Sequence, residues 1–254
     1  MPEVTLLARP VFGEAHRTFL RAHLPPEDAH WREDSSATDA ERLIEFAGRV
    51  CYLSFGRQQS PRSNAEYIAN LIRRGHDSVL EHAAWTFVLA GVSRAFTHQL
   101  VRHRVGFSYS QLSQQYHDER TTPFVRPPEL DRSARAAAAW DAAMAASRAA
   151  YTTIADELGL DEPGRLPAET RRALRSAARS VLPNAQESIV VVTANARSIR
   201  HFLKLRGGIE GDPEMRLVAA ALLDTLRPEA PALFADFVVS DPGDNMPLVS
   251  QVSL

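Results

Sequence analysis

The stretch from Arg102 to Tyr116 carries the densest set of side chains that could do chemistry. It opens with Arg102, His103 and Arg104, and the two guanidiniums offer several fixed donors to phosphate oxygens. The hydroxyls and amides that follow can hydrogen-bond a small polar ring or a sugar. They belong to Ser108, Tyr109, Ser110, Gln111, Ser113, Gln114 and Gln115. Charged donors for phosphate beside neutral donors for a base indicate a nucleotide site, and a solvated basic turn after a helix is the alternative.

The composition is that of an ordinary globular protein. The 254 residues are 44% hydrophobic and 24% charged, with a formal net charge of −2. No overall basic field therefore exists to hold nucleic acid, and any anion site must be local. Cys51 is the only cysteine, which excludes an intrachain disulfide and a multi-cysteine metal site. The sequence has no signal peptide and no apolar run of membrane length, so we expect a cytoplasmic protein.

Helices and strands must position these side chains. Capping boxes that begin at Thr38 and Ser63 predict helix starts, and β-branched runs predict strands. We expect strands over residues 4–7, 84–89, 188–194 and 234–239, and helices over 39–51, 63–75, 93–101, 133–158, 167–182, 195–206 and 212–223. Because no internal repeat or low-complexity linker interrupts the chain, we predict a single α+β domain over residues 1–254, with a mobile tail over about 240–254.

The spacing of other residues excludes several familiar chemistries. Gly207 and Gly208 follow a helix and not a strand, so they fail the context of a dinucleotide-binding loop. A group of histidines and one glutamate shows no metal-ligand spacing, and we expect no metal. Its members are His76, Glu81, His82, His98 and His103. Cys51 lies in an apolar helical segment, where we expect a buried, inert thiol.

Four segments together resemble the signature of flavin-dependent thymidylate synthases. That family has a Gly-His-x-Ser/Thr-x-x-Glu-His segment, an Arg-His-Arg motif followed by a spaced serine, an arginine before Leu-Pro-Asn, and an Asn-x-Arg that leads to His-Phe and a catalytic arginine. The resemblance spans about residues 40–237. The segments here are Gly75–His82, Arg102–Ser113, Arg179 with Leu182–Asn184, and Asn195–Arg197 with His201, Phe202 and Arg206.

The resemblance implies a central, mostly antiparallel sheet flanked by long helices, in a homotetramer whose active sites lie between subunits. It implies an FAD site formed by Ser78, Arg102, His103, Arg104, Gln111, Asn195, Arg197 and His201. It implies a uridine nucleotide site formed by Gln99, Arg102, Gln111, Leu112, Ser113, Gln114, Gln115, Arg179 and Arg206.

The resemblance also implies the reaction. In this family NADPH reduces the flavin, methylenetetrahydrofolate supplies a carbon, and the product carries a methyl group at C5 of uracil. Arg206 would be the catalytic residue, because a fixed positive charge near the N3–carbonyl edge of the base stabilises developing negative charge. The flavin supplies the redox chemistry, while the protein supplies orientation and electrostatics.

Two features depart from the family pattern. Eight residues, Val105 to Leu112, separate the Arg-His-Arg motif from Ser113, where seven are usual. We assign the extra residue to the neighbourhood of Gly106, because glycine allows a loop to bulge. Gln115 stands where the family has arginine. This change removes a charge-assisted bond worth roughly 1.5–3 kcal/mol, about ten- to a hundredfold in affinity.

A bulged loop beside the sugar could admit a ribose 2′-hydroxyl. We therefore hypothesise that the enzyme methylates UMP as well as dUMP, similar to the UMP/dUMP methylases of polyoxin biosynthesis, where the product would serve a nucleoside antibiotic. The first alternative is an ordinary dUMP-specific thymidylate synthase with a harmless loop insertion. A second is a non-catalytic flavin- or nucleotide-binding paralogue. RNA binding through the Arg-His-Arg motif is disfavoured by the net charge.

Overall fold

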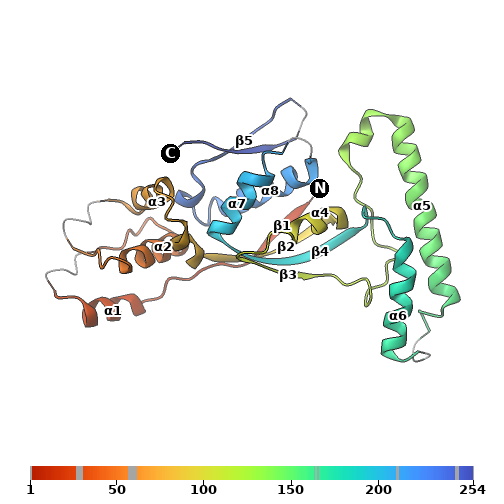
Figure 1. Ribbon diagram of the computed structural model, residues 1–254, viewed down its shortest axis with the longest axis horizontal. Helices are drawn as coiled ribbons and strands as arrows, with labels where there is room; N and C mark the ends of the chain where they lie inside the picture. Colours follow the sequence, from red (N-terminus) through yellow and green to blue (C-terminus); the bar gives the residue numbers. More distant parts are fainter. Residues whose placement is uncertain are drawn as a thin grey trace. The chain divides into compact units, whose positions relative to one another are not determined.

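The computed structural model describes residues 2–26, 31–56, 62–162, 164, 166–209, 212–243 and 246–253 (Figure 1). The chain divides into two compact units. Unit 1 consists of Met1–Glu3, Leu89–Arg102 and Ser110–Val190, and unit 2 consists of Val4–Val88, His103–Tyr109 and Val191–Leu254. No helix among the described residues is long and apolar enough to cross a bilayer.

The strands form one four-stranded and one two-stranded sheet, which confirms a mixed α and β fold. The larger sheet contains β1 (Glu3–Ala8), β2 (Ala84–Ser93), β3 (Phe107–Gln111) and β4 (Glu187–Asn195), in the order β1-β2-β4-β3. The smaller sheet pairs β5 (Phe237–Ser240) with β6 (Leu248–Gln251) in antiparallel orientation. All four strands of the larger sheet contribute residues to both units.

Strand β3 was not predicted from the sequence, although its side chains alternate. Phe107, Tyr109 and Gln111 are partly buried, and Ser108 and Ser110 between them are exposed. This period of two is the strand signal, but the hydroxyls and amides obscured it because they have low hydrophobicity. The first part of the polar stretch after the Arg-His-Arg motif, Phe107–Gln111, is therefore a strand and not a loop.

Unit 1 is mainly helical. Its elements are α4 (Arg94–Leu100), η3 (Pro128–Arg132), α5 (Ala134–Glu157), α6 (Ala168–Ala178) and η4 (Arg179–Val181). Helices α5 and α6 pack side by side (Figure 1) around a small apolar core. Its buried members are Tyr151, Ala155, Leu160 and Ala178. The last turn of the helix predicted over 167–182 is the 3₁₀ turn η4, which ends before Pro183 with a bond from the Leu182 amide to the Arg179 carbonyl.

Unit 2 contains most of the remaining helices. They are α1 (Ala15–His23), α2 (Asp39–Val50), α3 (Asn64–Arg73), η2 (Asp77–His82), α7 (Ala196–Arg206), α8 (Pro213–Leu226) and η5 (Ala232–Phe234). Both predicted capping boxes are present, at Thr38 and Ser63. Asn195 caps α7 and Asp212 caps α8, as predicted. Helix α1 and the 3₁₀ helix η2 were not predicted.

The segment after β5, for which the sequence predicts a mobile tail, contains strand β6. The Val249 amide donates to the Gly207 carbonyl at 3.0 Å, and Val249 is fully buried. A Cβ added to Gly207 would lie 2.6 Å from Cβ of Val249, so glycine lets the strand approach closely. The C-terminal end of α7, where Arg206 lies, is therefore covered by β6.

Candidate functional site

The site begins at the C-terminal end of α7, with the side chains of Arg206 and His103. The Nε–H of Arg206 donates to Nε2 of His103 at 3.1 Å, and both residues belong to unit 2. His103 is only 9% exposed. Burial holds the pKa of His103 below its ordinary value, and the positive charges of Arg206 and His201 lower it further. The imidazole is therefore neutral at physiological pH, with Nε2 as the acceptor and Nδ1 as the protonated nitrogen.

Three rings surround His103. Its centroid lies 5.3 Å from that of Phe202, 5.9 Å from that of Phe107 and 6.1 Å from that of His201. Phe202 is buried, whereas His201 is exposed. The phenol of Tyr109 donates to the His103 carbonyl at 2.6 Å, and burial raises the pKa of this phenol so that it remains a donor. The backbone and the ring of His103 are thus both held.

The turn after the Arg-His-Arg motif lies on the N-terminal end of α7. Gly106 has a φ of +71°, a left-handed conformation that favours glycine. Its carbonyl accepts from the Asn195 amide at 3.2 Å, and the Val105 carbonyl accepts from Ser198 Oγ at 2.8 Å. The predicted location of the extra residue is therefore a tight, hydrogen-bonded turn rather than a free loop.

Unit 2 contains six of the eight residues predicted to bind FAD. Arg197 forms a 2.5 Å ion pair with Glu81, which joins α7 to the Gly75–His82 segment. Both partners are exposed, so this pair adds little stability. The members in unit 2 are Ser78, His103, Arg104, Asn195, Arg197 and His201, whereas Arg102 and Gln111 belong to unit 1.

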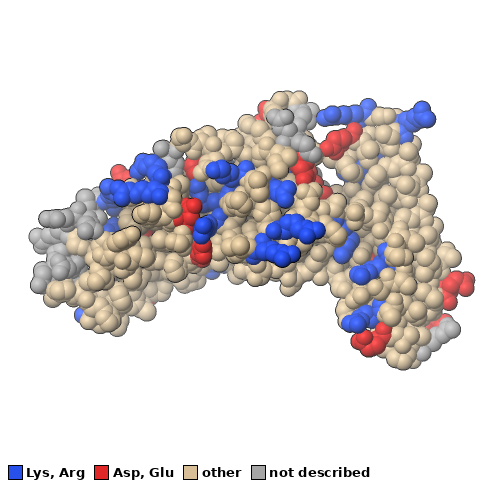
Figure 2. Space-filling view, viewed as in Figure 1, with Lys and Arg blue, Asp and Glu red and all other residues tan. Residues whose placement is uncertain are grey.

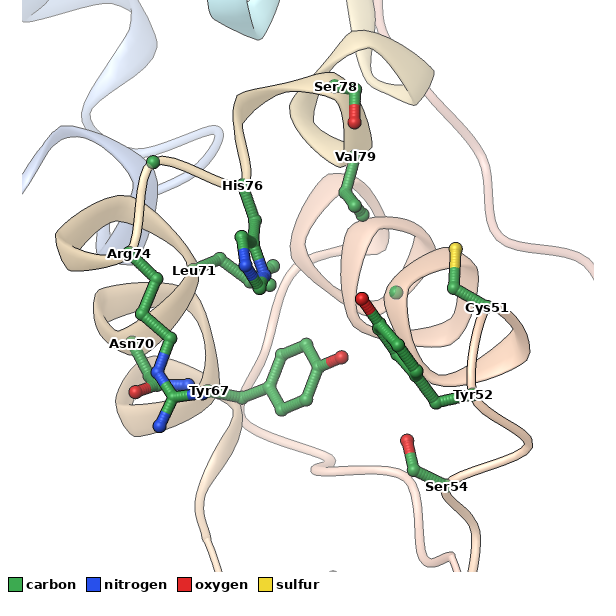
Figure 3. A pocket seen from close by; sticks show the side chains of 12 residues that line it. Cys51, Tyr52, Ser54, Tyr67, Asn70, Leu71, Arg74, His76, Ser78 and Val79 are labelled. Carbon is green, nitrogen blue, oxygen red and sulfur yellow. The ribbon is translucent and has the colours of Figure 1, made fainter.

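A cavity of about 430 Å³ lies within unit 2 between α2, α3 and η2 (Figure 3). Ser78 is at its wall, and the side chains of Tyr52 and Tyr67 point toward one another across it. Arg74 and His76 add a positive charge and an imidazole, so the donors suit an anionic or polar group of a dinucleotide. The residues present are compatible with part of FAD.

Cys51 also lines this cavity, and the prediction of a buried thiol is wrong. Helix α2 ends at Val50, so Cys51 follows the helix and is exposed. Its Sγ–H lies 3.5 Å from the Ala47 carbonyl, a local contact. The buried side of α2 includes Glu45 and Arg49, whereas the sequence predicted an apolar stripe there. The helix therefore buries a different side from the one expected.

Unit 1 contains all but one of the residues predicted to bind the nucleotide. Gln99 and Arg102 are exposed near the end of α4. The Gln111 amide donates to Thr97 Oγ1 at 3.1 Å and to Ser188 Oγ at 2.9 Å, so only its oxygen remains for a ligand. The unit 1 members are Gln99, Arg102, Gln111, Leu112, Ser113, Gln114, Gln115 and Arg179, and Arg206 belongs to unit 2.

Two of these glutamines differ in their surroundings. Gln114 is buried and donates to Gln186 Oε1 at 2.8 Å, and Gln186 in turn donates to Glu119. This relay fixes the chain, so Gln114 supports the site rather than facing a ligand through its amide nitrogen. Gln115 is half-buried and donates to Ser176 Oγ on α6 at 3.3 Å.

Arg179 has an arginine neighbour that the sequence did not single out. Burial lowers the pKa of Arg94, the carboxylate of Glu119 opposes this effect, and the positive charge of Arg179 adds to it. Arg94 is thus influenced by both a carboxylate and a guanidinium within unit 1.

Among the residues that the structure describes, no three His, Cys, Asp or Glu side chains are grouped so that they could hold a metal ion. Lys and Arg atoms of the described residues stand in separate groups on the face shown in Figure 2.

Comparison with known proteins identifies the family. The family described as thymidylate synthase complementing protein matches residues 35–232, more than half of the chain. The chain belongs to this family. Curated relatives named flavin-dependent thymidylate synthase include one from Mycobacterium sp. (strain JLS), 45% identical over 221 residues, which are 84% of this chain and 85% of the relative. Another, from Mycobacterium avium (strain 104), is 44% identical over 225 residues, 87% of this chain and 88% of the relative. A third, from Mycobacterium leprae (strain Br4923), is 42% identical over 228 residues, which are 85% of this chain and 87% of the relative.

The match to the thymidylate synthase complementing protein family covers every residue predicted for the site, from Ser78 to Arg206. The chain is an enzyme of this family. The resemblance drawn from four short segments is confirmed at the level of the family.

Proposed function

We propose that this enzyme is a flavin-dependent thymidylate synthase that methylates C5 of a uridine monophosphate. The observation that carries the proposal is the contact between Arg206 and the neutral His103 at the end of α7. The bond to a neutral acceptor fixes the direction of the guanidinium, which suits stabilisation of charge that develops on a substrate.

The residues of unit 2 support a flavin site. Ser78, Arg74 and His76 line a cavity whose donors fit part of FAD, and Arg197 and Asn195 stand at the start of α7. Bound FAD would supply the redox chemistry, with NADPH as reductant and methylenetetrahydrofolate as carbon donor. The chain's own contribution is to bind and orient these molecules, and Arg206 would stabilise negative charge on the N3–carbonyl edge of uracil.

The residues of unit 1 support recognition of the nucleotide. Arg179 and Arg102 would bind its phosphate. The Gln111 oxygen would accept from the base or sugar, because its amide hydrogens are already used. We expect a homotetramer in which subunits share active sites, and light scattering would measure this mass.

We further propose that UMP is accepted as well as dUMP, which would allow a role in nucleoside-antibiotic biosynthesis. The support is the spacing of eight residues between the Arg-His-Arg motif and Ser113, with Gly106 in a left-handed turn, and Gln115 where the resemblance implies an arginine. The alternative, strict use of dUMP, is favoured by the names of the mycobacterial relatives, which are thymidylate synthases.

A product assay tests both forms of the proposal. FAD-loaded protein is incubated with NADPH, methylenetetrahydrofolate and either dUMP, UMP or an equimolar mixture, and methylated nucleotides are separated and identified by mass. Product from both nucleotides supports relaxed sugar specificity, and product from dUMP alone removes it while keeping the enzyme class. Flavin that is bleached by NADPH without any methylated nucleotide would instead indicate a non-catalytic paralogue.

A further inference from the structure

Ser198, near the start of α7, donates hydrogen bonds from its backbone amide and from its hydroxyl. Its backbone amide donates to Asn195 Oδ1 at 2.9 Å, which caps the helix. Its side-chain Oγ donates to the Val105 carbonyl at 2.8 Å, in the turn after the Arg-His-Arg motif. Ser198 is buried, so no water competes freely for this bond. One residue thus joins the turn to the helix.

The turn itself lies against α7 at van der Waals contact. A Cβ on Gly106 would lie 2.1 Å from Ser198 Oγ and 2.5 Å from Asn195 Nδ2, and Gly106 has a positive φ. Val105 is 82% exposed, so its side chain does not anchor the turn. The turn is therefore held by two backbone carbonyls, which accept from Ser198 Oγ and from the Asn195 amide.

The same short segment also contacts the other end of α7. His103 precedes this turn by two residues and accepts from Arg206, the last residue of the helix. Ser198 and Arg206 are about 12 Å apart along the helix axis, since each residue adds about 1.5 Å. Residues 103–106 are thus fastened to α7 near its start by Ser198 and at its end by Arg206. A change in the turn must alter the position of His103 relative to the guanidinium.

We propose that Ser198 is a positioning residue, which holds the lengthened turn on α7 and thereby keeps His103 against Arg206. Its effect on methylation rests on the proposed function, but its effect on His103 does not. Among the contacts described, Ser198 touches neither the His103 ring nor the Arg206 guanidinium. It therefore acts through its hydrogen bond to the Val105 carbonyl. The groups that face His103 and set its protonation are Arg206 and His201, both on α7.

The test compares Ser198→Ala with Ser147→Ala. Ser147 lies on α5 in unit 1, and its Oγ also donates to a backbone carbonyl, that of Val181, at 2.7 Å. Both variants therefore lose the same kind of hydrogen bond. Histidine labelled with ¹³C at Cε1 is titrated in the FAD-loaded protein, and the His103 signal is assigned with His103→Gln. We expect Ser198→Ala to move the His103 midpoint upward toward the ordinary imidazole value, while Ser147→Ala leaves it in place.

Kinetics provide the second reading. Displacement of catalytic groups by a fraction of an ångström to an ångström lowers rates by roughly ten- to a hundredfold, so kcat of Ser198→Ala should fall within that range. The KM is measured for both dUMP and UMP, because the same turn is proposed to lie beside the sugar. An unchanged His103 midpoint together with unchanged kcat would overturn the proposal.

Gly106→Ala disturbs the same contact from the side of the turn. It provides a second test in case Ser198→Ala does not fold. Gly106 is exposed, so its substitution strains the turn without opening the core. It should raise the His103 midpoint as Ser198→Ala does, and an unchanged midpoint in this variant counts equally against the proposal. If the wild-type protein makes no methylated nucleotide but both variants shift His103, the proposed function fails while the positioning role stands.

Discussion

Arg206 donates through Nε to His103 Nε2 at 3.1 Å, so a permanent cation and a titratable ring share one hydrogen bond. The bond requires an unprotonated Nε2, and burial favours that form by lowering the pKa of His103. The bond to His103 thereby fixes the direction of the Arg206 Nε–H through a neutral acceptor.

Arg206→Ala should leave FAD bound and reduce methylation by about a hundred- to a thousandfold, since a fixed charge aimed at the transition state is lost. Flavin absorbance after gel filtration measures binding, and product formation measures turnover. Lys204→Ala is the matched control, because it removes an exposed cation from the same helix. Equal turnover in the two variants would show that Arg206 has no catalytic role.

The His103 pKa predicts a pH dependence of stability. The pKa of His103 is lower in the folded protein than in the unfolded chain, so the unfolded chain binds the proton more readily. The contribution of His103 to the free energy of unfolding is therefore fully present above the ordinary pKa of 6.5, and it is lost as the pH falls through the folded pKa. We expect His103→Gln to flatten the rise in the free energy of unfolding across this window. Denaturant titrations at several pH values measure it, with His98→Gln, an exposed histidine on α4, as the control. Identical slopes in all three proteins would contradict the prediction.

The single cysteine reports on the cavity of unit 2. Because Cys51 and Ser78 line the same cavity, bound FAD should slow alkylation of Cys51 by iodoacetamide at least severalfold. Mass spectrometry of quenched samples gives the rate, and unfolded protein gives the unprotected limit. Ser78→Ala should need more FAD for the same protection. Alkylation at equal rates with and without bound flavin would place the cofactor elsewhere.

Gln115→Arg introduces the charge that the resemblance implies at this position. The variant should bind the nucleotide about ten- to a hundredfold more tightly, as expected for a regained charge-assisted bond. Calorimetry with dUMP measures the affinity. Ala173→Arg adds the same charge to an exposed position of α6 in the same unit and should have little effect. A similar gain in both variants would indicate general attraction rather than a specific contact.

Asp236→Asn tests a buried ion pair that supports α7. Arg200 donates to both carboxylate oxygens of Asp236, at 2.7 and 2.6 Å, and Asp236 is 1% exposed. Burial alone would raise the pKa of this carboxyl, but bonds from Arg200 and Gln251 outweigh it and lower the pKa. The substitution removes the negative charge that faces this buried guanidinium and should cost about 3–5 kcal/mol in denaturant titrations. Asp224→Asn, exposed on α8, should cost less than about 0.5 kcal/mol.

Local signals predicted the helices well because the residues that cap them are adjacent in sequence. Thr38 and Ser63 form complete capping boxes, and Asn195 and Asp212 cap α7 and α8 as expected. The exposure of Cys51 was mispredicted because tertiary contacts decide which side of α2 is buried. Glu45 accepts from Trp31 and from Arg49, which draws two charged residues into the interior.

The site could be predicted as a set of residues but not as an arrangement. The resemblance supplied Arg206 and His103, yet they are 103 residues apart, and no spacing rule joins them. Ser198 was missed because a serine near a helix start is ordinary in sequence and gains meaning only from the turn above it. The influence of Arg179 on Arg94 was missed for a similar reason, since it depends on how α4 and η4 fold within unit 1.

The contact between Gly207 and Val249 also sets an order of events during biosynthesis. A ribosome makes α7 before β6, so the Gly207 carbonyl emerges without the Val249 amide that later donates to it. A nascent chain arrested between the two segments would contain the arginine at an uncovered helix end. The surroundings of Arg206 therefore mature later in translation than the helix that bears it.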